Sequence, residues 1–193
     1  MEQVAAGEPA LFQYKNMTML MNCSRNCDFV VTVDPTVKPQ LFGLSIEPNQ
    51  TMALTMNING SPLEGAQTMQ QNLNCYYEIE PNAEIKLKAQ LRLHIDQTEL
   101  SQQLNREVNA SRLTWMYWNK TRSEWEPVES HMDQDGYLVC NTDHFSTWTV
   151  AELAETETTG SIDSGLPVEY VFAGVAVAVV AVVVVVFAYK KRN

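Results

Sequence analysis

Basic side chains, histidines and phosphate-binding glycine loops are all scarce in this chain of 193 residues. It has 13 lysines and arginines against 23 acidic residues, and three of the basic ones are Lys190, Lys191 and Arg192. A chain that is so acidic before its last four residues repels phosphate backbones, which excludes nucleic acid as a partner. With three histidines and no glycine-rich loop, the sequence predicts no metal hydrolase, no nucleotide-binding site and no cofactor.

A long uncharged segment runs from Tyr170 to Tyr189, and half of its 20 residues are valine. A helix of this length rises about 30 Å, the thickness of a bilayer core. The sequence therefore predicts a single transmembrane helix over residues 170–189. Acidic Glu169 before it and the basic tail 190–193 after it place the tail in the cytoplasm and residues 1–169 outside the cell membrane. Gly174 and Ala178 form a small-xxx-small pair, which predicts weak homodimerisation.

Glycosylation sequons support the same orientation, because six of them precede the predicted helix where chance gives about two. They begin at Asn16, Asn22, Asn49, Asn59, Asn109 and Asn119. The segment Met1 to Ala10 has neither the basic region nor the apolar core of a signal peptide. Either the chain is the C-terminal part of a longer surface protein, or it is tail-anchored with a cytosolic domain. The sequons and the charge bias favour the first interpretation.

The four cysteines, Cys23, Cys27, Cys75 and Cys140, form an even set that permits three disulfide connectivities. An extracellular location favours disulfides. We expect a local Cys23–Cys27 bridge and a long Cys75–Cys140 bridge. A zinc site is the competing interpretation, but no histidine lies at ligand spacing from these cysteines.

Hydrophobic residues alternate with polar ones along most of the chain. From Ile85 to Ile95 every second residue is apolar, which predicts a long strand with one buried face and with His94 in solvent. Further strands are expected at 11–21, 29–33, 41–46, 51–58, 76–79, 113–118, 137–140 and 145–150, and one short helix at 98–108. The fold class is therefore mainly β: an antiparallel β-sandwich over 1–153, or two small β subdomains meeting near 81. A polar, threonine-rich stalk over 154–169 precedes the membrane helix.

The segment from Ile85 to Val150 combines this alternating strand with ASRLTWMYWNKTRSEWEPVES and DGYLVCNTDHFSTWTV. It resembles the β-sandwich module that closes the ectodomains of many cell-surface proteins just before their membrane anchor. The resemblance implies a single-pass surface glycoprotein with a non-catalytic, membrane-proximal spacer or interaction module. Its partners would be surface proteins or glycans.

The ending at His144-Phe145-Ser146 also resembles, more distantly, the proteolysis-site motif of adhesion receptors. That resemblance implies an alternative in which His144 is the base and Ser146 attacks the preceding carbonyl in an N-to-O acyl shift. The motif's second cysteine is Thr142 here, and its leucine is Phe145. The simpler interpretation is that His144 and Ser146 form hydrogen bonds in a turn while Phe145 packs.

Two other groups suggest ligand binding, and each has a structural alternative. Met17, Met19 and Met21 recur every second residue, so their thioethers could hold Cu(I), although core packing explains the same spacing. The aromatic group Trp115, Tyr117, Trp118 and Trp125 could form a carbohydrate-stacking platform. Because Trp115 and Tyr117 share a strand face and Trp118 opposes them, this group also fits a sandwich core with one outward ring.

Overall fold

The computed structural model describes residues 2–62 and 65–153. All of the described residues belong to one compact unit. The expected membrane helix at 170–189, the stalk, the basic tail and the Gly174 and Ala178 pair lie outside the described residues. Within the described residues no helix is both long and apolar enough to cross a membrane.

Strands dominate the described part of the chain, as the alternating pattern predicts. In chain order the elements are β1 (Glu2–Val4), β2 (Ala10–Tyr14), β3 (Met17–Cys23), β4 (Cys27–Val33), β5 (Gln40–Pro48), β6 (Met52–Asn59), β7 (Asn72–Pro81), β8 (Leu87–His94), α1 (Gln97–Leu104), a 3-10 turn η1 (Ala110–Arg112), β9 (Leu113–Asn119), β10 (Glu124–Val128), β11 (Ser130–Met132), β12 (Tyr137–Thr142) and β13 (Thr147–Glu152). The expected helix at 98–108 is shorter and begins earlier, because the Asp96 side chain caps its N-terminus by accepting from the Glu99 N–H.

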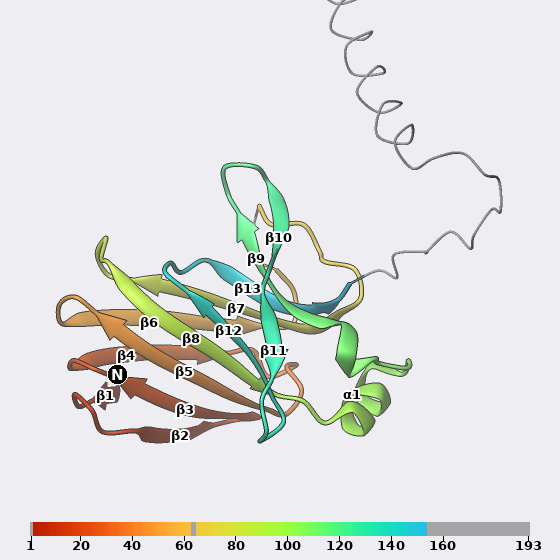
Figure 1. Ribbon diagram of the computed structural model, residues 1–193. Coiled ribbons are helices and arrows are strands. Elements are labelled where there is room, and N and C mark those ends of the chain that lie inside the picture. The colour runs from red at the N-terminus through yellow and green to blue at the C-terminus, as the bar shows by residue number, and fades with distance from the viewer. Residues whose placement is uncertain (1, 63–64, 154–193) are drawn as a thin grey trace, which may run out of the picture. The chain divides into compact units, whose positions relative to one another are not determined.

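These strands form two sheets that pack on each other as a β-sandwich (Figure 1). The seven-stranded sheet has the order β1-β4-β6-β7-β13-β9-β10, and the six-stranded sheet has the order β11-β12-β8-β5-β3-β2. Aromatic rings join the two sheets: Phe42 of β5 stacks on Tyr77 of β7 with ring centroids 4.7 Å apart. Trp115 of β9 packs edge-on against Phe42 at 6.3 Å.

The sandwich is not wholly antiparallel, which corrects one part of the prediction. β3 pairs with β5 in parallel, and β4 pairs with β6 in parallel. From β3 to β6 the chain changes sheets at every connection, so each strand returns to its own sheet after two reversals and points the same way as its neighbour. The breaks at Asp34-Pro35 and Glu47-Pro48 therefore mark crossings between sheets and not hairpins.

The expected strand 11–21 is also corrected, because a turn divides it into β2 and β3. Lys15 adopts a left-handed conformation with φ of 53°, and β3 folds back to pair with β2. The strand expected from Ile85 agrees closely with β8: Leu87, Ala89, Leu91 and Leu93 are buried, and His94 is exposed. Along β8, every second side chain is thus buried, as the alternation of apolar and polar residues predicts.

Candidate functional site

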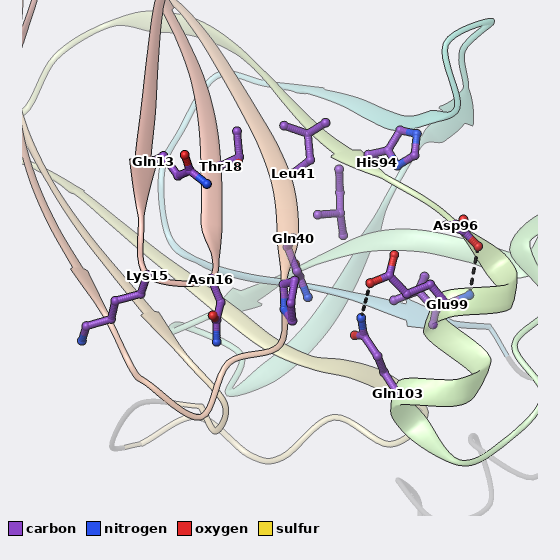
Figure 2. Close-up of a pocket in the computed structure, with 13 residues that line it drawn as sticks. Gln13, Lys15, Asn16, Thr18, Gln40, Leu41, His94, Asp96, Glu99 and Gln103 are labelled. Carbon is purple, nitrogen blue, oxygen red and sulfur yellow. Dashed lines mark hydrogen bonds between the residues drawn. The ribbon is translucent and has the colours of Figure 1, made fainter.

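A cavity of about 390 Å³ lies at one end of the six-stranded sheet, where the β2–β3 turn, β5 and the end of β8 face α1 (Figure 2). It is lined by Gln13, Lys15, Asn16, Thr18, Pro39, Gln40, Leu41, Leu93, His94, Asp96, Glu99, Leu100 and Gln103. The lining therefore combines amide and carboxylate side chains with apolar ones.

Several polar groups of this cavity are already held by hydrogen bonds. The Gln103 Nε2 donates to Glu99 Oε1 at 2.8 Å, and Asp96 Oδ1 accepts from the Glu99 N–H at 2.9 Å. The Asn16 Nδ2 donates to the Val37 carbonyl at 3.0 Å. Each carboxylate retains its second oxygen, which has no hydrogen-bond partner within the described part of the chain. The cavity can thus accept hydrogen bonds from a polar neutral ligand through these two oxygens.

Sequence reasoning missed this cavity because its polar residues come from four separate segments. Gln13, Gln40, Asp96 and Gln103 lie on β2, β5, the α1 cap and α1. No local spacing links them, and only the packing of α1 beside the sheet brings them together.

His144 and Ser146 precede β13, but their hydrogen bonds go to different partners. The His144 Nδ1 lies 3.2 Å from Thr142 Oγ1 and 3.1 Å from Asp143 Oδ1, and its ring packs against Tyr117 at 4.7 Å. The hydrogen bond with His144 holds the pKa of Asp143 below its usual value. The Ser146 Oγ donates to the Trp118 carbonyl at 2.7 Å. The arrangement places the two side chains of the alternative self-cleavage motif in separate hydrogen-bond groups, while Phe145 is half-buried against the core.

The aromatic group does not form an open stacking platform. Trp115 is fully buried between the sheets, where its Nε1 donates to the Leu138 carbonyl at 3.0 Å. Trp118 does face the opposite side of its sheet, but it is only 6% exposed, because Trp125 packs on it at 5.5 Å. The Trp125 Nε1 in turn donates to the Gln67 carbonyl at 2.7 Å. The expected outward ring is thus covered by its hairpin neighbour.

The three methionines occupy the inward face of β3. Met17, Met19 and Met21 are each at most 1% exposed, which agrees with core packing. Met19 and Met21 border a cavity of about 370 Å³ near the edge strand β2, where Phe12 and Phe29 also contribute to the lining. Across residues 2–62 and 65–153, no three His, Cys, Asp or Glu side chains are grouped to hold a metal ion.

All four cysteines are buried and free, so neither expected disulfide is present. Cys23 and Cys27 nevertheless share a hydrogen bond across the β3–β4 crossing, which raises the pKa of Cys23 and lowers that of Cys27. Cys75 and Cys140 lie in different sheets, and burial raises the pKa of each thiol to about 12. The groups that partly offset these shifts belong to each thiol's own sheet: Tyr77 on β7 lowers the pKa of Cys75, and the Leu91 backbone on β8 lowers that of Cys140.

The sequon asparagines all have side chains at least partly open to solvent. Asn16, Asn22, Asn49 and Asn109 are exposed, and Asn59 and Asn119 are half-buried. The Asn119 Nδ2 donates to Glu126 Oε1 at 2.7 Å and the Asn16 Nδ2 donates to the Val37 carbonyl at 3.0 Å, so both of these amides already form one hydrogen bond.

Comparison of the chain with protein-family models, with curated proteins and with solved structures finds no match.

Proposed function

We propose that the protein is a single-pass cell-surface glycoprotein whose β-sandwich is a non-catalytic, membrane-proximal spacer or interaction module. The sandwich would stand outside the cell, and its C-terminal tail would lie in the cytoplasm. Partners would be surface proteins or glycans.

The observation that carries the proposal is the position of the sequons on the sandwich. All six asparagines fall on exposed or half-buried positions, and none lies in the buried core. Asparagine is common in polar turns, yet the six sequons exceed the chance number of about two. Sequon asparagines that all reach the surface of the sandwich support export.

The hydrogen bonding of the final turn supports the non-catalytic role over self-cleavage. A general base must come within hydrogen-bond reach of the group that it deprotonates. His144 instead lies among Thr142 and Asp143, and the Ser146 hydroxyl donates to a backbone carbonyl. In this proposal both side chains stabilise the turn that precedes β13 through these hydrogen bonds.

The thiol pair also suits an oxidising compartment. Cys23 and Cys27 are near enough in the fold to shift each other's pKa, and neighbouring thiols of this kind form disulfides in an oxidising compartment. The bridge would tie the two sheets at one crossing.

The test is removal of N-glycans from the full chain expressed in a eukaryotic cell. We expect the protein to migrate above its polypeptide mass of 21.8 kDa and to shift down after treatment with an N-glycosidase. A control variant with all six sequon asparagines changed to Gln should show no shift. A parent chain that behaves like this control would overturn the proposal.

A second measurement separates the spacer from the self-cleaving alternative. The denatured parent protein, the His144→Ala variant and the Ser146→Ala variant should each give one band of full length. A pair of fragments from the parent that disappears in Ser146→Ala would show that the module cleaves itself.

A further inference from the structure

The cavity beside α1 contains a glycosylation sequon in its wall. Asn16 and Thr18, the first and third residues of the sequon, both line it, and Figure 2 shows Asn16 at the β2–β3 turn across from the Gln103 side chain. The Asn16 side chain is exposed, so the amide is open to modification. In contrast, Asn49 lies exposed just after β5 and lines none of the cavities described above.

The attachment point is held in place by two hydrogen bonds. The Asn16 carbonyl accepts from the Gln40 N–H at 3.0 Å, and the Asn16 Nδ2 donates to the Val37 carbonyl at 3.0 Å. A glycosylated asparagine retains one N–H on Nδ2, so the bond to Val37 can persist after modification. The first sugar would therefore start from a fixed position at the rim of the cavity.

The lining of the cavity suits an N-acetylated sugar. Glu99 and Asp96 each offer a second carboxylate oxygen to a hydroxyl group, and the Gln13 and Gln103 amides can pair with hydroxyl or acetamido groups. Pro39 and Leu41 provide an apolar surface for the C–H face of a sugar ring and for an acetyl methyl group, while Leu93 and Leu100 also line the cavity but are largely buried. The volume of about 390 Å³ falls within the range of roughly 300 to 1,000 Å³ that is typical of small-ligand sites.

We propose that this cavity seats the first N-acetylglucosamine residues of a glycan attached to Asn16. The inference rests on the proposed export of the domain. In the attachment step the Asn16 Nδ2 forms a bond to the sugar C1 of a lipid-diphosphate oligosaccharide, the C1–O bond to the diphosphate breaks, and the amide proton leaves to a base. Because the glycan is then tethered at the rim, contacts that would be weak for a free sugar suffice to hold it.

The test compares the release of glycans from Asn16 and Asn49 on the full-length glycoprotein. An endoglycosidase that cleaves between the first two N-acetylglucosamine residues is added to the native protein, and each site is followed by glycopeptide mass spectrometry. We expect Asn16 to be released more slowly than Asn49 by on the order of tenfold, a factor that corresponds to about 1.4 kcal/mol of protection. Denaturation should make the two rates equal.

A double substitution in the cavity lining tests whether the cavity is what slows the release of the Asn16 glycan. Glu99→Ala with Gln103→Ala removes two groups that face the sugar without changing either sequon, and circular dichroism checks that the sandwich is intact. Release at Asn16 should rise to the rate at Asn49. A Glu124→Ala variant, on the exposed β10 edge, is the matched control and should leave the protection unchanged.

The outcomes separate this inference from the proposed function. If no sequon carries a glycan, the proposed function fails and the inference fails with it. If Asn49 carries a glycan while Asn16 is empty, or if both are released equally fast from the native protein, only the inference fails. Protection at Asn16 that survives the lining variant would also overturn it.

Discussion

Replacing Trp115 with phenylalanine probes the contact between the two sheets. Trp115 is fully buried and lies within 6.5 Å, centroid to centroid, of Phe42, Tyr77 and Trp148. Trp115→Phe leaves the buried Leu138 carbonyl without its indole donor, at a cost of about 1 to 3 kcal/mol. The smaller ring also leaves a void of about 40 Å³, which adds about 1 kcal/mol. We therefore expect a loss of about 2 to 4 kcal/mol in the free energy of unfolding.

Equilibrium unfolding of the full chain in urea, followed by circular dichroism, measures this loss through the transition midpoint at an unchanged slope. Trp125→Phe is the control, because Trp125 is half-buried and its hydrogen bond to the Gln67 carbonyl lies near solvent. Its cost should be about 1 kcal/mol or less. Equal losses for the two variants would refute the placement of Trp115 at the centre of the sandwich.

Three further predictions follow from named contacts. Oxidation of Cys23 with Cys27 closes a five-residue loop and should add about 2 kcal/mol of stability, while Cys75 and Cys140 remain as thiols. Differential alkylation measures which cysteines are oxidised. A disulfide-linked peptide that contains Cys75 and Cys140 would contradict the prediction. Met19→Ala should cost about 2 to 5 kcal/mol and Met19→Leu less than about 1.5 kcal/mol, as expected for a core side chain, and thermal unfolding measures both. Asp133→Asn should destabilise the protein at pH 7, because backbone donation from Tyr137 and the nearby Arg92 lower the folded pKa of Asp133. A carboxylate whose pKa is lowered by folding stabilises the protein at pH values above its unfolded pKa of about 3.8. The difference in unfolding free energy between the parent and Asp133→Asn should therefore disappear as the pH falls through the folded pKa of Asp133.

The buried faces could be predicted from the sequence because alternation is a local signal. Met17, Met19 and Met21 point inward as their spacing indicates, and so do the apolar residues of β8. Strand pairing is not local, however. Alternation is the same whether the chain at Asp34-Pro35 folds back in one sheet or crosses to the other, so the parallel pairs of β3 with β5 and β4 with β6 could not be foreseen.

The site residues depend even more on long-range packing. Trp118 alternates with Tyr117 and should face outward, but its burial is set by Trp125 of the next strand. The cavity beside α1 requires the β2–β3 turn at Lys15, and the only local sign of that turn is the pair of polar residues Lys15-Asn16, which interrupts the alternation within residues 11–21. The sequon at Asn16 can be recognised from the sequence, whereas the cavity next to it cannot be predicted from it.

The central claim, that the sandwich stands outside the cell on a single-pass chain, is tested most directly by protease treatment of intact cells. The full chain carries an epitope tag after Asn193, and the fate of residues 1–169 and of the tag is followed with antibodies against each. The account predicts that protease digests the sandwich while the tag stays protected until the membrane is permeabilised. A sandwich that resists protease in intact cells and is digested only after permeabilisation would contradict the claim and favour a tail-anchored cytosolic domain.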